Sequence, residues 1–438
     1  MSSKSADYQI IRRGLTAVRP ILLSRWYLPT IIAFGFAIRL YWILVFHPYP
    51  VSDFGFYFHS AESIVKGYGY VTDHGFATAY FPIGYPFFLA ILFWVFGVSV
   101  TVAETANLIL SVASLVLAYR IARAIFKSEA AGWFSLLFLA IYPNNISYTS
   151  LVSTEILYLF LLLLGLDLLL PCVSAKGVAH VGRLLTAGFV FAFATLVKVQ
   201  TLFLPAFLLL LFPKFWRERV SLVSQLKRVA VLYVAFIIGL SPWIIRNYEL
   251  FNDIVLTNTG GLNLYIGNGP EANGTFVEIP WLGAVNSMQD EYNVNQIARR
   301  KAIDYIERHP RRTVSLMPKK LVALFDSGDG LYWNTEGTGK GSTYRRHVLS
   351  SLDQLNSIYE SIVYVIFVAS LLFGCWKRLR YGKDGGWPLL GIAVIFYFVG
   401  IYLVYYGAAR YNFPIIPWMI MYSAALLASP FEKRARGS

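Results

Sequence analysis

The chain has 438 residues, of which 57% are hydrophobic and 14% are charged, and its mean hydropathy is +0.55. A soluble domain usually carries about 25% charged residues, so this composition excludes an ordinary soluble protein, a disordered chain and a coiled coil. The formal net charge is +14. We expect basic loops that face the cytoplasm and anionic lipid, and no nucleic-acid partner, because the basic clusters are short and lie between apolar runs.

Apolar runs that could cross a bilayer recur along the chain. A crossing needs about 20 mostly apolar residues. The candidate runs are 28–46, 104–121, 130–148, 154–172, 184–197, 201–212, 229–245, 357–376, 387–405 and 413–427. The fifth and sixth runs are short and could form one kinked hairpin. The sequence therefore predicts an all-α, polytopic helix bundle with about ten transmembrane helices.

A further apolar stretch, 80–96, contains Pro82, Gly84 and Pro86, and it is either a short span or a helix lying in the interface. Basic clusters distinguish the two readings. They lie at 4–25, 120–127, 176–183, 214–228, 377–383 and 433–436. If 80–96 is interfacial, every cluster falls on one side of the membrane, whereas a crossing would send the later clusters outward. The positive-inside rule thus favours an outer juxtamembrane helix and two cytoplasmic termini.

This topology divides the chain into five parts. They are a cytoplasmic segment 1–27, a transmembrane core 28–245 with an outer loop 47–96, a small outer subdomain 246–356, C-terminal transmembrane helices 357–430, and a cytoplasmic tail 431–438. No cleavable signal peptide is expected, because the first 27 residues are polar and basic and no small-residue cleavage site follows the first apolar run. Cys172 and Cys375 are too few for a disulfide framework and read as small hydrophobic residues.

Two carboxylates are expected at the outer surface. Asp53 follows the first span by about seven residues, and Pro48 and Pro50 stiffen its approach. It could act as a general base on an acceptor hydroxyl, or it could be a solvated loop acid at a helix start. Glu155 precedes the long apolar run of the fourth span, where it could bind substrate or simply suit a helix N-terminus.

Three cations are expected at the same surface. Lys198 separates two apolar half-spans, and Arg246 and Arg410 each leave a span on the outer side. Each alone could be a snorkelling anchor or a nonspecific lipid contact. Together with the two acids they indicate a site in which cations hold a lipid phosphate and an acid activates a hydroxyl.

Other chemistries receive little support. His47, His59 and His74 share the first outer loop, but their spacing fits no simple metal pattern, so we expect no metal site. The chain lacks a GxxxxGK[ST] loop and a GxGxxG motif after a strand, which argues against a cytoplasmic nucleotide site.

The order of several motifs resembles the GT-C superfamily of integral-membrane glycosyltransferases, and most closely its branch of protein O-mannosyltransferases and lipid A aminoarabinose transferases. The motifs, in chain order, are VSDFGFY, SIVKGYGY, AYFPIGYPFFLAILFWVFG, YRIARAIF, IYPNNISYTSLVSTEILYLF, TLVKVQTLFLP, SPWIIRNYELFNDIVLTNTGGLNLYIGNGPEANG and ARYNFPIIPW. Each motif is weak alone, but their order extends over nearly the whole chain. Some relatives carry a second acid after the first, whereas here Phe54 follows Asp53.

The resemblance implies transfer of a sugar, usually with inversion, from a polyprenyl-phosphate donor to an acceptor lipid, glycan or protein outside the inner (plasma) membrane. It implies that Asp53 is the base, that Lys198, Arg246 and Arg410 hold the lipid phosphate, and that Glu155 orients acceptor or sugar. Tyr80 and His59 are further candidates to orient the acceptor. No cofactor is expected beyond the lipid carrier, and a divalent metal stays open as an alternative. The main alternative is a transporter or flippase of lipid-linked glycans, although the sequence shows no internal repeat; a membrane scaffold would not need these charges.

Overall fold

The computed structural model describes residues 26–174, 181–215, 221–279, 281, 285–338, 343–381 and 388–432. Over these residues the chain is helical, and its one β pairing is an isolated antiparallel bridge between Val71 and Ala77. The predicted all-α class is confirmed. The predicted cytoplasmic ends and several of the basic clusters lie wholly or partly outside the described residues.

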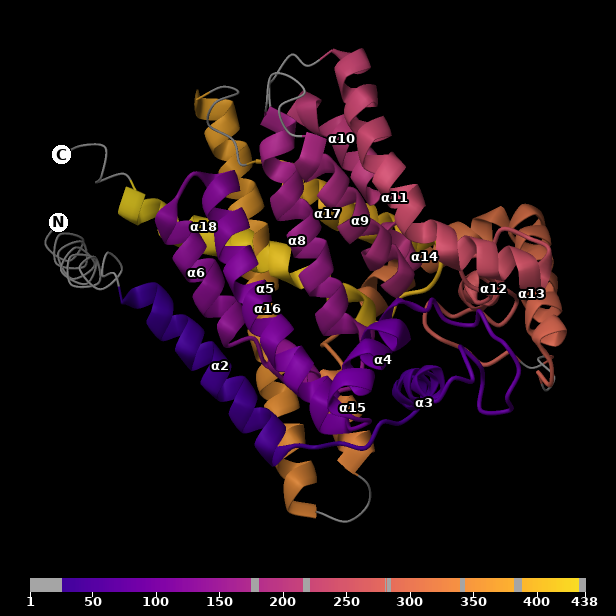
Figure 1. The fold of residues 1–438 in the computed structure, drawn as a ribbon. Coiled ribbons are helices and arrows are strands. Elements are labelled where there is room, and N and C mark those ends of the chain that lie inside the picture. The colour runs from indigo at the N-terminus through magenta and orange to yellow at the C-terminus, as the bar shows by residue number, and fades with distance from the viewer. Residues whose placement is uncertain are drawn as a thin grey trace, which may run out of the picture.

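The apolar runs form the helices of the bundle (Figure 1). They are α2 (Tyr27–Val45), α5 (Val100–Phe126), α6 (Glu129–Ala140), α8 (Thr154–Ser174), α9 (Val181–Val197), α10 (Leu204–Phe215), α11 (Leu222–Phe251), α16 (Thr343–Tyr381), α17 (Leu390–Val404) and α18 (Ile416–Glu432). Of these, α2, α5, α8, α11 and α16 are long and apolar enough to cross a bilayer, and the others are shorter. The chain is a multi-pass membrane protein.

Further elements connect these helices. They are α3 (Asp53–Val65), α4 (Gly84–Phe96), α7 (Pro143–Ser147), η1 (Tyr148–Ser150), η2 (Val199–Thr201), α12 (Gly260–Asn268), α13 (Met288–Arg308), α14 (Pro310–Leu324), α15 (Gly330–Thr338) and η4 (Ala409–Asn412). At a rise of about 1.5 Å per residue, the 13-residue α4 spans about 20 Å, less than a hydrocarbon core of about 30 Å. Its interfacial position stays a prediction.

Helix boundaries differ from the predicted runs at three places. The run 130–148 is split, because α6 ends at Ala140 and Pro143 starts the separate helix α7, where a proline suits the first turn. The fifth and sixth runs are two helices, α9 and α10, joined through a 3₁₀ turn. Helix α16 begins at Thr343, well before the predicted run, so it extends into the segment expected to lie outside the membrane.

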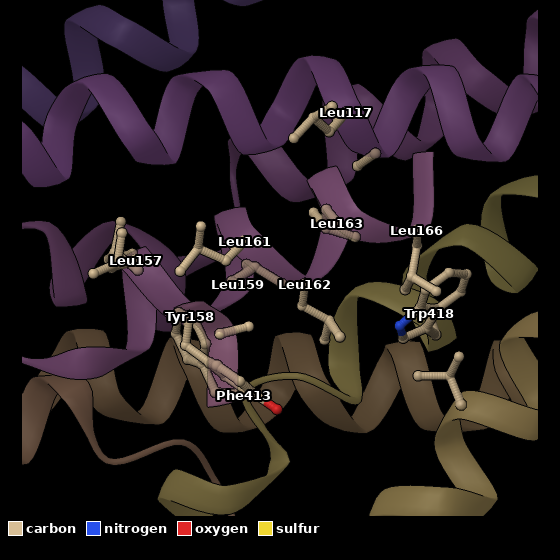
Figure 2. Packing of buried hydrophobic residues seen from close by; sticks show 14 of the residues in the cluster. Leu117, Leu157, Tyr158, Leu159, Leu161, Leu162, Leu163, Leu166, Phe413 and Trp418 are labelled. Atoms are coloured by element: carbon tan, nitrogen blue, oxygen red, sulfur yellow. The ribbon is translucent and has the colours of Figure 1, made fainter. Parts of the chain in front are cut away.

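Helix α8 is the centre of the bundle. Most of its side chains are apolar and buried. Its charged residues are Glu155 in its first turn and Asp167, which pairs with Arg120, and this pattern is typical of a helix largely enclosed by protein. Figure 2 shows Leu157, Leu162 and Leu166 of this helix between α5, which carries Leu117, and the C-terminal segment, which carries Phe413 and Trp418. A polar group at the start of α8 is therefore held by a fixed, closely packed element.

The segment between α11 and α16 packs against the bundle at one end of α17. Its helix α12 packs on α13 around a small apolar cluster that includes Leu262, Ile266 and Ala298, and Figure 1 shows α12, α13 and α14 gathered at one side of the molecule. Helix α14 contacts both α17 and η4. This packing brings the segment directly against the turn that carries Arg410.

Candidate active site

Four of the residues predicted from the sequence form one connected ion-pair cluster. The Arg410 guanidinium donates through Nε to Glu155 Oε1 at 2.6 Å and through Nη1 to Asp53 Oδ2 at 3.0 Å. Lys198 Nζ donates to the same Glu155 Oε1 at 2.8 Å. Glu155 thus binds both cations, and Arg410 joins the two carboxylates.

The four residues of the cluster come from four different elements, each at or near an end of its element. Glu155 lies in the first turn of α8, and Lys198 follows the last residue of α9, where the backbone becomes extended. Arg410 lies in η4 between α17 and α18. Asp53 is the first residue of α3, and Ser52 before it has a φ of 54°. Such a left-handed conformation is strained for serine and fixes the direction in which α3 leaves the loop.

Exposure differs sharply within the cluster. The Glu155 side chain is fully buried, those of Lys198 and Arg410 are 11% and 14% exposed, and that of Asp53 is 38% exposed. Burial alone would lower the pKa of Arg410, but the charge of Glu155 and other neighbours raises it well above its ordinary value. Asp53 is therefore the carboxylate that a bound molecule can reach, and Glu155 is the one that fixes the cations.

Aromatic rings enclose the cluster. The Arg410 guanidinium lies 5.1 Å from the centre of the Phe54 ring, and Tyr402 stacks on Tyr411 with ring centres 4.7 Å apart. Burial, and then the charge of Asp53, raise the pKa of Tyr80 to about 12. Phe54 and Tyr402 are themselves almost wholly buried, so these rings form part of the packed interior beside the charged groups.

The sequence analysis missed a third carboxylate, Asp329. It accepts a hydrogen bond from Tyr148 Oη at 2.5 Å and another from Trp333 Nε1 at 2.8 Å, and burial raises its pKa. Trp333 in turn contacts the Phe54 ring edge-on at 5.2 Å between ring centres. Asp329 follows Gly328 and precedes Gly330, and this glycine-flanked acid was the one available signal.

Two predicted residues do not join the cluster. Arg246 donates to the backbone oxygens of Thr78 at 2.7 Å and Tyr70 at 3.1 Å, so its described contacts hold the first outer loop. His59 lies 3.7 Å from Glu62 on the same helix and is 45% exposed. Over the part of the chain that the structure describes, no group of three or more His, Cys, Asp or Glu side chains is placed to hold a metal ion.

The turn that carries Arg410 is held by the segment preceding α15. Lys320, buried on α14, donates through Nζ to Leu403 O at 3.0 Å and to Asn268 Oδ1 at 2.9 Å. Burial lowers the pKa of Lys320 to about 8. The backbone of Gly407 packs so closely on Lys320 O that a side chain would not fit there. Lys320 thus satisfies a carbonyl at the C-terminal end of α17 and fixes the start of the turn.

One comparison with known protein families matches part of the chain. Residues 81–245 match the family model described as dolichyl-phosphate-mannose-protein mannosyltransferase. The matched stretch contains Glu155 and Lys198, and it confirms the family resemblance predicted from the sequence over that part of the chain. The chain is thus a helical membrane protein that is similar, over this stretch, to a family of mannosyltransferases.

Among solved structures, the chain is similar to the crystal structure of ArnT from Cupriavidus metallidurans bound to undecaprenyl phosphate. The TM-score is 0.47 and the sequence identity is 13%, over 94% of this chain and 79% of that chain. No curated protein matches the chain.

Glu155→Gln tests whether the cluster is a buried ionic network. The substitution removes one of the two carboxylates that neutralise the buried cations Lys198 and Arg410. We therefore expect the free energy of unfolding to fall by about 3–5 kcal/mol. Thermal unfolding in detergent, followed by tryptophan fluorescence, measures it. The control Glu62→Gln removes a partly exposed ion pair with Lys66, in which the two charged atoms are 2.8 Å apart, and it should cost much less stability. Equal losses for the two variants would contradict the network.

Lys320→Met tests the support of the Arg410 turn. It leaves Leu403 O and Asn268 Oδ1 without a donor, so we expect a loss of about 1–3 kcal/mol in stability and a lower kcat. Lys319→Met, on the exposed neighbour, is the matched control and should behave as the wild type. If both variants keep wild-type kcat and melting temperature, Lys320 does not fix this turn.

Proposed function

We propose that the protein transfers a sugar from a polyprenyl-phosphate carrier to an acceptor hydroxyl on the outer face of the membrane, with inversion at the anomeric carbon. The observation that carries the proposal is the arrangement of Arg410, which joins a buried, fixed carboxylate to a partly exposed one. The family match supports the class of reaction. The positive-inside pattern supports a site on the periplasmic or outer side of an inner (plasma) membrane, with both termini in the cytoplasm.

In the proposed reaction, Asp53 accepts the proton of the acceptor hydroxyl. The acceptor oxygen forms a bond to the anomeric carbon, the bond from that carbon to the phosphate oxygen breaks, and its electron pair leaves with the polyprenyl phosphate. The leaving phosphate gains negative charge in this step. Lys198 and Arg410 are placed to stabilise that charge, because Glu155 holds both cations in fixed positions.

The ion pair between Arg410 and Asp53 suggests how donor binding prepares the base. The two carboxylates and the two cations of the cluster have a formal net charge of zero. A phosphate that binds there must therefore replace a carboxylate beside one of the cations. Asp53 is the more exposed of the two carboxylates and is held by one hydrogen bond, at 3.0 Å. We expect the phosphate to take over this contact and leave Asp53 free to accept a proton.

The other predicted residues take different parts in this proposal. Tyr80, whose pKa is raised by burial and then by the charge of Asp53, would orient the acceptor. Arg246 would act indirectly, by fixing the loop between α3 and α4. Asp329, with Tyr148, would form a second polar wall beside Arg410.

Asp53→Asn tests the proposed base. Asparagine keeps the size of the side chain but cannot accept the proton, so we expect transfer to fall by about 10²–10⁴-fold. The measurement is transfer of radiolabelled sugar from a panel of polyprenyl-phosphate sugars to membrane extract by purified protein. Asp73→Asn, an exposed acid of the same loop, is the control and should keep wild-type transfer.

Three outcomes would count against the proposal. Near-normal turnover by Asp53→Asn would remove Asp53 as the base. Movement of a lipid-linked sugar across a liposome bilayer without covalent transfer would favour the flippase alternative. Retention of label on the donor with every donor of the panel would contradict the proposed use of polyprenyl-phosphate sugars.

A further inference from the structure

Three polar side chains lie along one face of α5, in the half of the helix that begins at Val100. Glu104, Asn107 and Ser111 are spaced by three and four residues, so they share that face, and all three are buried. Polar groups inside a membrane-spanning helix are costly, and their presence there is a sign of function. The contacts that they make indicate what the function is.

Two of these side chains connect α5 to other parts of the bundle. Asn107 Nδ2 donates to Leu151 O at 2.8 Å, four residues before Glu155 of the ion-pair cluster. Ser111 Oγ accepts a hydrogen bond from Arg39 Nε of α2 at 2.7 Å. This face of α5 therefore holds α2 and the chain that leads into α8 in fixed relative positions.

The third side chain, Glu104, contacts the segment that leads to the proposed base. It is fully buried, and its Oε2 lies 2.7 Å from Nδ1 of His47, whose side chain is 52% exposed. Among the described residues, neither carboxylate oxygen of Glu104 has another polar partner. A buried carboxylate with so little compensation contributes little to stability. A role in positioning the segment after His47 accounts for it better.

The six residues after His47 lead directly to Asp53, along the stretch of chain that runs from the end of α2 to α3 in Figure 1. Tyr49 N donates to Gly337 O of α15 at 2.9 Å. Ser52, the residue before the base, has the strained φ of 54°. A strained residue keeps its conformation only where the surrounding structure holds it. Helix α3 holds one side of Ser52, and the contacts of His47 and Tyr49 hold the other.

The proposed reaction makes this second hold necessary. Before the donor binds, Arg410 holds the Asp53 carboxylate directly at 3.0 Å. The arriving phosphate is expected to take over that contact. From then on, the direction of the Asp53 side chain depends on its own backbone, which α3 and residues 47–52 fix.

We infer that His47 and Glu104 are positioning residues for the base, and that their contact keeps Asp53 directed at the acceptor hydroxyl after Arg410 has bound the donor phosphate. They act through the backbone of residues 47–53 and not by touching a substrate. The inference rests on the proposed function and deepens it, because it names the groups that keep the base oriented.

Variants of His47 test the contact in the full chain in lipid nanodiscs. His47→Leu removes it, whereas His47→Asn keeps a donor, because the asparagine amide nitrogen takes nearly the place of Nδ1. With a donor of the polyprenyl-phosphate panel, we expect kcat to fall by about 10–100-fold in His47→Leu and by less than about threefold in His47→Asn, since misplacing a catalytic group mainly slows the chemical step. The KM for donor should stay unchanged in both variants. His74→Leu, on an exposed histidine of the same outer loop, is the matched control.

Glu104→Leu separates positioning from stability. Leucine removes the buried charge, and the His47 that it leaves without a partner is half-exposed to solvent. The melting temperature should therefore be equal to that of the wild type or higher, while kcat falls as it does in His47→Leu. Glu104→Gln keeps an acceptor for His47 and should retain most of the wild-type kcat.

Amide hydrogen exchange gives a readout that does not depend on transfer. In His47→Leu and Glu104→Leu, exchange over residues 47–56 should be about tenfold faster than in the wild type, with no change over α8. Because His47 acts through Asp53, adding His47→Leu to Asp53→Asn should not lower transfer any further.

The inference is overturned if His47→Asn loses as much kcat as His47→Leu, if exchange over 47–56 is unchanged in His47→Leu, or if Glu104→Leu loses melting temperature and kcat together. Failure of the proposed function gives a different result. In that case Asp53→Asn would transfer normally while exchange over 47–56 still depends on His47. If Asp53→Asn abolishes transfer but His47→Leu keeps wild-type kcat, the glycosyltransferase stands and the positioning inference fails.

Discussion

The site depends on one buried carboxylate, that of Glu155, which forms ion pairs with two cations. Glu155 is wholly enclosed at the start of α8, and a carboxylate in such a place is costly unless charged donors satisfy it. Lys198 and Arg410 do so from elements that are distant in sequence. The requirement to compensate Glu155 therefore fixes the turn between α9 and α10 and the turn between α17 and α18. The positions of both cations, and through Arg410 that of Asp53, follow from it.

This compensation explains how a site with strong charges persists beside a membrane. The central helix α8 is mostly buried (Figure 2), and the Glu155 side chain at its start is fully enclosed, so it has little freedom to move. The Arg410 turn is fixed from the opposite side by Lys320 and by the close backbone contact at Gly407. Groups that are already oriented cost little reorganisation when charge develops on a leaving phosphate. The exposed Asp53 is the one member of the cluster that is open to exchange its partner.

The sequence predicted the helical class, the approximate spans and the meeting of Asp53, Glu155, Lys198 and Arg410, because all four lie at span ends on one predicted face. It did not predict the contacts of Arg246, whose partners are backbone oxygens of a loop more than 160 residues earlier. It also missed Asp329, which is tied to the site through Tyr148, 181 residues away in the chain. Such pairings depend on tertiary packing that neither periodicity nor charge pattern reports. The break between α6 and α7 was readable in principle from Pro143.

Phosphate binding at the cluster is the central claim, and one titration tests it most directly. Thermal stability of the purified protein in detergent would be followed while a polyprenyl phosphate, or the matching polyprenol without phosphate, is added. The account predicts that the phosphate raises the melting temperature of the wild type, that the polyprenol does not, and that Lys198→Gln abolishes the difference between the two lipids. An equal shift with both lipids, or an undiminished difference in Lys198→Gln, would contradict the assignment of these cations to the lipid phosphate.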